Sequence, residues 1–382
     1  MLHSDTVMTM PQTPVRIIGA GIGGLTLGRC LLKYGIPAVL YEKMPSNPRH
    51  DYGITLHAPS YLPLLDILGM DEFTFRRRIA VDGLLGGSGN INPGSFVTPR
   101  RVNSTSFRAH RGKFEKLLCE GLDIQWGNSL EKVEEAPSGM ILHMQNGQKL
   151  ESTCIVGADG PHSNTRKSLS PNTSFSILPY VAFNGKRRVK RALYDSLYAP
   201  AFNGSNVIEK KQGDVVLNVS VNEQQADTVS ISWIFSRPAR GSTDPLHRPN
   251  RPVSDATDIP KEFFDEIERL HGLDQPFKEV FDSEKLKMER VLHWLMRTVL
   301  VNPQELGALA NKGVFFMGDS MHAEPILGGE GANNAIIDGM ELAKCISRFG
   351  QGGIARWYES RYPAWKDGIS ESEQAIALMH RK

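Results

Sequence analysis

Residues 15–43, VRIIGAGIGGLTLGRCLLKYGIPAVLYEK, carry the strongest structural signal in the chain. An apolar strand runs into Gly19, Gly21 and Gly24, and a helix and a second apolar strand follow. In such a βαβ unit the first glycine permits a tight turn, the second lets the backbone approach a pyrophosphate, and the third lets the helix pack closely on the sheet. Glu42 ends the second strand, where a carboxylate accepts hydrogen bonds from ribose hydroxyls. The stretch predicts a dinucleotide-binding unit without indicating which dinucleotide it binds.

The bulk composition is that of an ordinary globular enzyme. The chain has 382 residues, enough for two domains or one large one, of which 40% are hydrophobic and 23% charged. A formal net charge of +2 argues against a nucleic-acid or membrane-surface partner. The four cysteines follow no disulfide or metal-binding pattern, so we expect reduced thiols and no metal site. Because we find no signal peptide, membrane anchor or long apolar run, we expect a cytoplasmic protein.

Two further stretches place a carboxylate at the end of an apolar strand. Residues 153–169, TCIVGADGPHSNTRKSL, lead a strand into Asp159. Residues 313–350, GVFFMGDSMHAEPILGGEGANNAIIDGMELAKCISRFG, lead a strand into Asp319, and a glycine-rich turn then opens a helix near Gly331. Ligand sites in parallel sheets lie at the carboxyl ends of strands, and helix N-termini attract anions. Both stretches therefore indicate ligand-facing ends of strands.

The segment between these stretches has a different periodicity. Residues 215–221 and 229–235 alternate between apolar and polar types around a polar turn, which predicts an antiparallel hairpin with one buried face. We expect Trp233 and Phe235 to belong to its core. Residues 236–260 predict a long irregular loop, whose four arginines we interpret as solvated.

The last stretch, residues 356–382, predicts a terminal helix interrupted near Pro363 and Gly368.

Three glycine-rich motifs in this order make the chain resemble the single-component (class A) flavin-dependent monooxygenases, the family with the para-hydroxybenzoate hydroxylase fold. The resemblance covers essentially the whole chain. The first motif is GAGIGG with Glu42, and the second is GADG with Ser163 and Arg166. The third motif comprises Gly318, Asp319, His322, Pro325, Gly329, Gly331 and Asn333. Ile326, Ser320 and Met321 depart from the family pattern, so the pocket wall beside the flavin is expected to differ.

The resemblance implies an α/β fold: a discontinuous Rossmann-like FAD-binding domain, an inserted antiparallel β-sheet that binds the substrate, and a C-terminal helix. The implied FAD-binding domain comprises residues 14–82, 101–174 and 285–345. The implied substrate domain comprises residues 83–100 and 175–284, and residues 346–382 form a C-terminal helical segment.

The resemblance also implies which residues hold the cofactors. Those expected to bind FAD are Gly19, Gly21, Gly24, Glu42, Arg111, Asp159, Asp319, Gly331, Ala332 and Asn333. Asp159 would also serve NAD(P)H use, since the family has no separate nicotinamide domain.

The implied function is that of an NAD(P)H-consuming monooxygenase that inserts one oxygen atom of O2, by way of a flavin C4a-hydroperoxide. The substrate would be a small aromatic or polyunsaturated, polyketide-like metabolite, hydroxylated or epoxidised as in fungal secondary metabolism. A flavin-dependent reductase or oxidase on the same scaffold stays open as an alternative. A non-catalytic flavin-binding protein is a more distant one. The sequence does not choose between NADH and NADPH, and it does not indicate the oligomeric state.

The catalytic acid or base has no fixed position in the family. His50 precedes a short strand after the first unit, and its titration range suits proton transfer. The inserted sheet offers Arg187, Tyr180 and Tyr194 instead.

Overall fold

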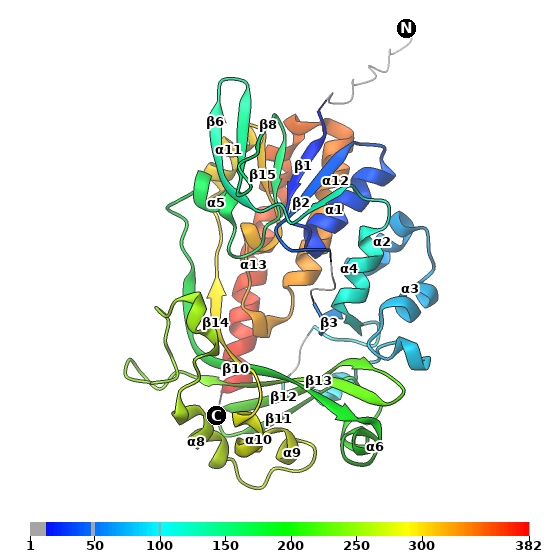
Figure 1. Cartoon of the computed structure of the whole chain (residues 1–382), viewed down its shortest axis with the longest axis vertical. Helices are drawn as coiled ribbons and strands as arrows, with labels where there is room; N and C mark the ends of the chain where they lie inside the picture. Colours follow the sequence, from blue (N-terminus) through cyan, green and yellow to red (C-terminus); the bar gives the residue numbers. More distant parts are fainter. Residues whose placement is uncertain (1–12, 47–49, 99–100, 382) are drawn as a thin grey trace.

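The computed structural model of the protein describes residues 13–46, 50–98 and 101–381. Two units lie one above the other along the long axis, and a long C-terminal helix runs beside both (Figure 1). We call them the parallel-sheet unit and the antiparallel-sheet unit. This architecture confirms the fold class expected from the sequence.

The parallel-sheet unit is built around five parallel strands in the order β15-β9-β1-β2-β5. Their bounds are β1 Val15–Ile18, β2 Ala38–Glu42, β5 Ile124–Trp126, β9 Ile155–Gly157 and β15 Val314–Phe316. Helices α1 (Ile22–Lys33) and α12 (Gly331–Phe349) pack against each other. Gly339 permits this contact, because a Cβ at that position would lie 2.9 Å from the backbone nitrogen of Leu27. The strands whose ends carry Glu42, Asp159 and Asp319 are thus neighbours or near neighbours in one sheet.

Smaller elements flank the parallel sheet. Strands β3 (Gly53–Leu56) and β4 (Phe107–His110) form an antiparallel pair, and β6, β7 and β8 form a three-stranded meander. The meander strands are β6 Leu130–Ala136, β7 Gly139–Met144 and β8 Lys149–Ser152. The flanking helices are α2 Ala58–Leu68, α3 Glu72–Ile79, α4 Arg111–Cys119, α5 Asn164–Leu169 and α11 Pro303–Ala310.

The antiparallel-sheet unit has five strands in the order β11-β12-β13-β10-β14. Their bounds are β10 Ser176–Lys190, β11 Val207–Gln212, β12 Val215–Gln224, β13 Thr228–Pro238 and β14 Val291–Thr298. The chain leaves the parallel-sheet unit at β10 and returns after β14 (Figure 1). The proposed domain boundaries remain predictions, and residues 47–49, 99–100 and 382 of the predicted segments lie outside the described residues.

The two faces of the antiparallel sheet differ in what covers them. On the outer face, Trp233 and Phe235 are fully buried and pack against Phe263, which confirms the core expected for this hairpin. The helices that contribute to this layer are α6 Arg191–Leu193, η3 Tyr194–Tyr198, α7 Ala199–Phe202, α8 Lys261–Glu268, α9 Phe277–Val280 and α10 Ser283–Lys287. On the inner face, Ala182 and Val216 pack against Ile376 of the C-terminal helix. The inner face is therefore the one that meets the rest of the molecule.

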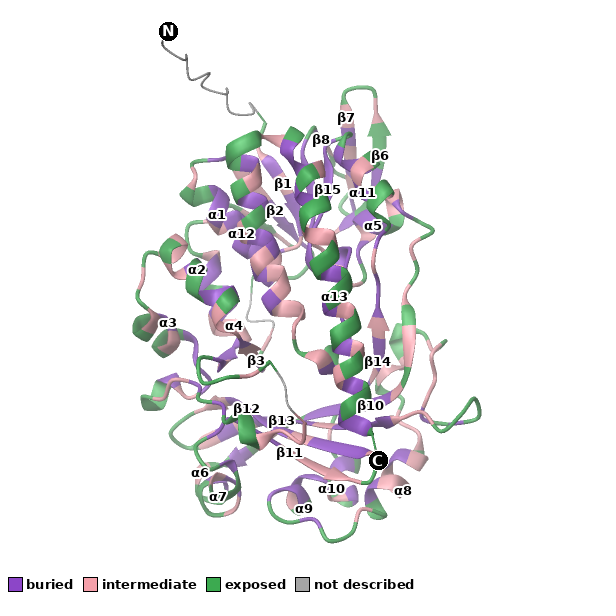
Figure 2. Ribbon diagram, turned by 180° about the vertical axis from the view of Figure 1, so that it is seen from behind, coloured by how far each residue is buried: buried purple, intermediate pink, exposed green. Residues whose placement is uncertain are grey.

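The C-terminal helix α13 (Ile354–His380) is continuous, so the expected interruption near Pro363 and Gly368 is wrong. A proline inside a helix removes one backbone hydrogen bond. Here the buried side chains of Trp365 and Ile376 anchor the helix to the core of the parallel-sheet unit and to the inner face respectively, so packing overrides the local break. Figure 2 shows α13 bridging the two units, with buried residues recurring along its length.

Within the described residues, no helix combines the length and the apolar composition needed to cross a bilayer.

Candidate functional site

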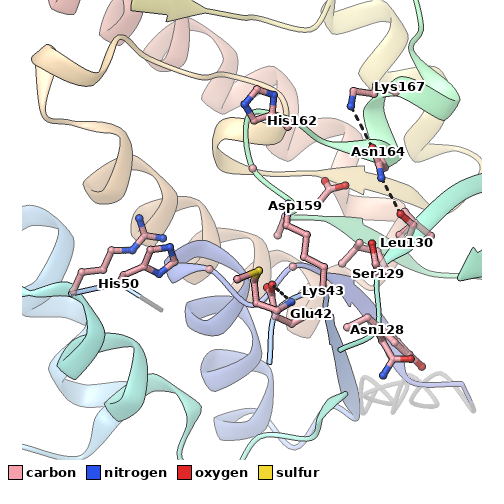
Figure 3. A pocket seen from close by; sticks show the side chains of 18 residues that line it. Glu42, Lys43, His50, Asn128, Ser129, Leu130, Asp159, His162, Asn164 and Lys167 are labelled. Carbon is pink, nitrogen blue, oxygen red and sulfur yellow. Dashed lines mark hydrogen bonds between the residues drawn. The ribbon is translucent and has the colours of Figure 1, made fainter. Parts of the chain in front are cut away.

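A cavity of about 400 Å³ opens at the carboxyl ends of β1, β2 and β9 (Figure 3). Its lining includes six of the residues that the sequence singled out: Gly19, Gly21, Glu42, His50, Arg111 and Asp159. They come from four separate segments of the chain, which the parallel sheet and α4 bring together. The cavity therefore matches the dinucleotide site expected from the β1-α1 turn.

The three glycines of the β1-α1 turn have distinct structural roles. Gly19 has a φ of +105°, and a Cβ there would lie 2.4 Å from the carbonyl oxygen of Ala158. A Cβ at Gly24 would lie 2.1 Å from the carbonyl oxygen of Gly19, so this glycine lets α1 approach the turn. Gly21 is the N-cap of α1, and a Cβ there would meet no atom within 4 Å. The backbone at Gly21 thus borders open space at a helix N-terminus, where an anion such as a pyrophosphate is favoured.

Glu42 is buried at the end of β2, and backbone groups orient its carboxylate. One carboxylate oxygen accepts a hydrogen bond from the Ala20 N–H at 2.8 Å, and the other accepts one from the Met44 N–H at 3.0 Å. Figure 3 shows this side chain at the cavity wall. The two hydrogen bonds hold the acid where a ribose would meet it.

Arg111 and His50 are joined by one carboxylate. The Arg111 Nε donates to Glu115 Oε1 at 2.9 Å, and His50 Nδ1 lies 2.9 Å from Glu115 Oε2. Arg111 also donates to the Tyr52 hydroxyl. Burial acts to lower the pKa of Arg111, but Tyr52 and Glu115 outweigh it and raise that pKa above its usual value. Arg111 is therefore a fixed cation at the cavity, and His50 stands beside it among the dinucleotide-site residues.

Asp159 provides the clearest test of whether the residues present fit a dinucleotide. Its Oδ2 accepts hydrogen bonds from the Thr165 N–H at 3.0 Å and from the Thr165 hydroxyl at 3.1 Å. Its Oδ1 is buried and has no hydrogen-bond partner among the described residues. A buried carboxylate oxygen costs free energy unless it is hydrogen-bonded. The residues present therefore fit a ligand that brings donors, such as the hydroxyls of a dinucleotide.

Asp319 lies beside the start of α12. A Cβ at Gly331 would be 3.4 Å from Asp319 Oδ1, so carboxylate and helix N-terminus are adjacent. Burial raises the pKa of Asp319, whereas the charges of His322, Arg111 and Arg166 act to lower it. Arg166 of the second motif donates to the carbonyl of Ser320 at 2.5 Å and to that of Pro161 at 2.6 Å. The second and third motifs are therefore held together by this arginine.

Asn333 connects α12 to β3. Its Oδ1 accepts hydrogen bonds from the His57 N–H at 2.9 Å and from the Ser60 hydroxyl at 2.6 Å, and its Nδ2 donates to the Thr55 carbonyl at 3.1 Å. The side chain thus positions the start of α12, while Ala332 packs at the edge of the core.

One pair in this region is absent from the sequence-based site. His57 Nε2 lies 3.1 Å from Glu330 Oε1, immediately before α12, and both side chains are largely buried. Two features of the sequence point to this pair: His57 stands at the end of the short strand, and Glu330 lies inside the third motif.

Two of the catalytic candidates lie elsewhere. Arg187 is on the outer face of the antiparallel sheet, 2.5 Å from Glu289 Oε1 and 2.8 Å from Glu279 Oε2. Tyr194 is buried on the same side and stacks on Tyr198. The structure does not bring either residue near His50, and the reason is that the inner face, not the outer one, meets the parallel-sheet unit. Tyr180 packs against the inner-face cluster, with its ring 5.2 Å from that of His380.

Comparison with known proteins extends over nearly the whole chain. A family model described as "FAD binding domain" matches residues 114–362. The FAD-dependent monooxygenase nscC of Trichophyton rubrum is 32% identical over 397 residues, covering 98% of this chain and 96% of that protein. The FAD-dependent monooxygenase adaC of Aspergillus niger is 30% identical over 390 residues, covering 96% and 94%. Klebsiella pneumoniae HpxO complexed with FAD and uric acid shares the fold, with a TM-score of 0.69 at 17% identity over 99% of this chain and 91% of that one.

The parallel-sheet unit, its glycine-rich β1-α1 turn and the inserted antiparallel sheet form the fold that HpxO shares, and the family model and the fungal relatives place this fold in the class A flavin-dependent monooxygenases. With these relatives, the chain belongs to the family of FAD-dependent monooxygenases, and FAD is its cofactor.

Proposed function

We propose that this protein is an NAD(P)H-consuming monooxygenase that inserts one atom of O2 into a small aromatic, polyketide-like molecule. The observation that carries the proposal is that Arg111 links the cavity at the β1-α1 turn to the start of α12. Arg111 lines the cavity that holds Gly21 and Glu42, and its charge also acts on Asp319 at the start of α12. A site that extends from one to the other suits a long dinucleotide with its reactive ring at the α12 end.

The residues present divide the binding of FAD among them. The N-terminus of α1 at Gly21 would receive the pyrophosphate, and Glu42 would accept hydrogen bonds from the adenosine ribose. Asp159 and Asp319 would accept hydrogen bonds from further hydroxyls of the ligand. Gly331, Ala332 and Asn333 begin α12, whose positive dipole end favours negative charge beside it. When bound, FAD supplies hydride acceptance and oxygen activation.

The substrate class is proposed from the inner face. Tyr180, Ile234 and Trp294 are partly buried and pack against the apolar inner-face cluster, so the face offers flat apolar surface. HpxO, which shares the fold, was solved with uric acid, a planar ring compound. The fungal relatives nscC and adaC carry the monooxygenase name. An aromatic metabolite of fungal secondary metabolism is consistent with all three points.

The test is turnover by the purified protein under isotopically heavy O2. The protein should purify yellow with bound FAD, and NADH or NADPH should drive O2 uptake that rises with an accepted phenol or polyketide. The product should carry one heavy oxygen atom. Reduction of a substrate without oxygen incorporation would favour the reductase or oxidase alternative instead, and a protein that binds FAD but turns over no substrate would favour a non-catalytic role.

Variants of the cavity test the assignment of its residues. Glu42→Arg places a cation where backbone N–H groups are directed, and Asp319→Ala removes a carboxylate at the α12 end, so both should purify with little FAD. His50→Ala is the matched control in the same cavity and should keep FAD. If His50→Ala also keeps full coupled oxygen transfer, His50 is not the catalytic base.

A further inference from the structure

The parallel-sheet unit meets the inner face of the antiparallel sheet at the β3-β4 pair. The Gly53 N–H donates to Asn222 Oδ1 at 2.9 Å, and Arg108 donates from NH2 to the Ser220 hydroxyl at 3.0 Å. Asn222 and Ser220 both belong to β12, so this contact joins the two units. Arg108 is one of the cations at this contact, where Lys113 of α4 pairs with Glu223 of β12 at 2.8 Å.

Arg108 has only neutral partners among the described residues. Besides Ser220, its guanidinium donates to the Thr55 hydroxyl at 3.3 Å, and its buried Nε has no hydrogen-bond partner there. None of the carboxylates in the described ranges lies within 4.0 Å of it. Burial lowers the pKa of Arg108 to about 10, which still leaves the group positively charged at neutral pH. A cation out of water without a counter-ion is unfavourable unless an anion or a polar ligand completes its shell.

A second cation faces the same part of the inner face. Lys186 on β10 is in register with Ser232 on β13, which is in register with Ser220 on β12. Neighbouring strands are about 4.8 Å apart, so Lys186 begins about 10 Å from Ser220 along this row. Its ammonium donates to the main-chain carbonyl of Asp51 at 2.6 Å and lies 5.2 Å from the Tyr52 ring centroid. The hydroxyls of Ser220 and Ser232 therefore lie between Arg108 and Lys186.

Two arginines on the outer face of the antiparallel sheet are neutralised by carboxylates. Arg187 contacts the carboxylates of Glu279 and Glu289, and Arg237 contacts those of Asp244 and Glu266. These ion pairs neutralise both arginines without any ligand. Arg108 differs because its hydroxyl partners orient the N–H donors of the guanidinium but cannot neutralise its charge.

We propose that Arg108, with Lys186 as a second contact, binds an ionised oxygen of the substrate, so that the enzyme selects aromatic compounds bearing a carboxylate or an ionised enol or phenol. This inference rests on the proposed function, whose substrate it specifies. An anion at this place would neutralise Arg108 and accept a hydrogen bond from it, and such a bond between two charged groups is one that neutral isosteres cannot form.

The test compares matched probes on the oxidised, FAD-loaded protein. One pair is 2-naphthoate and 2-naphthamide, and the other is 2-hydroxy-1,4-naphthoquinone, an enol ionised at neutral pH, with its neutral methyl ether. Binding is followed by the change in flavin absorbance or fluorescence. The charged member of at least one pair should bind about ten- to a hundredfold more tightly, as expected for a hydrogen bond between charged groups. The pair that shows this preference identifies a carboxylate or an enolate as the source of the charge.

Variants then locate the preference. Arg108→Gln should reduce it to about twofold or less, and Lys186→Gln should reduce it in part. Arg240→Gln is the control, because Arg240 is an exposed arginine of the same unit whose partner is Glu266, and it should leave the preference unchanged. FAD content is measured on every sample, so that loss of the cofactor is not mistaken for loss of recognition.

Several outcomes overturn the inference. They are equal binding of the charged and neutral members, absence of binding of all four probes at millimolar concentrations, and an Arg108→Gln protein that holds FAD and keeps the preference. Should Arg108→Gln fail to fold, the wild-type comparison still decides whether anions are selected, and Arg108→Lys tests the fork of donors. Selection of anions without NAD(P)H-driven oxygen transfer would count against the proposed function alone, whereas oxygen transfer without selection would count against this inference alone.

Discussion

The two faces of the antiparallel sheet differ in the partners of the arginines that contact them. On the outer face, aromatic side chains fill a core, and Arg187 and Arg237 each contact two carboxylates. On the inner face, serine and asparagine side chains of β12 and β13 lie beside Arg108 and Lys186, whose hydrogen-bond partners are neutral oxygens. Burial alone does not separate a structural arginine from a ligand-binding one. Arg187 and Arg237 differ from Arg108 in the charge of their partners.

The largest expected effect is on the outer face, at Arg237. This side chain is 1% exposed and donates to both oxygens of Asp244 and both of Glu266, which holds the pKa of Asp244 well below its usual range despite burial. Arg237→Met leaves the buried carboxylate of Asp244 without its cation and Glu266 with the exposed Arg240 alone, so the free energy of unfolding should fall by about 3–5 kcal/mol in urea titrations. Arg240→Met, at an exposed arginine, should cost less than about 1 kcal/mol. Equal losses of unfolding free energy in the two variants would contradict the expected difference between a buried and an exposed arginine.

Arg187→Gln should have the next largest effect. Glu289 would lose its ion pair and Glu279 would keep only that with Lys285, but all three side chains of the Arg187 cluster keep some contact with solvent, so we expect a loss of about 2–3 kcal/mol of unfolding free energy. FAD content and the binding preference for anionic probes should be unchanged. A variant of normal stability that has lost oxygen transfer would instead restore Arg187 as a catalytic candidate.

His293 provides a pH-dependent test of the outer face. Burial, with nearby Arg251, Arg248 and His247, lowers the pKa of His293 from 6.5 to about 3. Between these values the unfolded chain binds a proton that the folded protein excludes, so stability falls as pH decreases below 6.5 and is unaffected above it. The slope for one proton is about 1.4 kcal/mol per pH unit.

The matching substitution is His293→Phe, since the His293 ring already stacks on Phe183 at 4.8 Å. Urea titrations between pH 4 and 8 should show a shallower acid loss in this variant than in the wild type. His271→Gln, at an exposed histidine, serves as the control and should reproduce the wild-type slope. Parallel curves for wild type and His293→Phe would contradict the assignment.

The smallest expected effect is that of Tyr194→Phe. The ring stacks on Tyr198 at 5.8 Å, and phenylalanine preserves this packing, so unfolding should change by less than about 1 kcal/mol. NAD(P)H-driven turnover should also be retained. A large loss of turnover at unchanged stability would show that Tyr194 acts in the reaction after all.

The parts of the fold that follow local patterns could be predicted from the sequence. The strand-glycine-helix pattern at Gly19 to Gly24 fixes its own backbone, since a Cβ at Gly19 or Gly24 would collide with neighbouring carbonyls. Alternation along β12 and β13 identified Trp233 and Phe235 as core residues. The acids Glu42 and Asp159 could be assigned to one cavity because the carboxyl ends of parallel strands share an edge.

The features that depend on docking could not be predicted. Alternation along β10 separates two faces without telling which one meets the cofactor unit, so Arg187 was a reasonable catalytic candidate until the docked face was known. Arg237 looked solvated because its partner Glu266 belongs to a later helix. Arg108 gave no signal at all, since the neutral character of its partners exists only once β4 stands against β12.

Helix α13 adds a constraint on the order of assembly. Near its middle, Trp365 donates to Asp338 Oδ1 in the parallel-sheet unit at 2.9 Å, and at its C-terminal end His380 Nε2 lies 2.9 Å from the Ser236 hydroxyl of β13. During translation α13 emerges from the ribosome after all the other described elements, on the order of seconds later at typical elongation rates. The strands of both sheets emerge beforehand, but the contacts of α13 with the core of the parallel-sheet unit and with β13 form only after α13 has emerged. The spacing of the two units is therefore the last feature of the fold to be set.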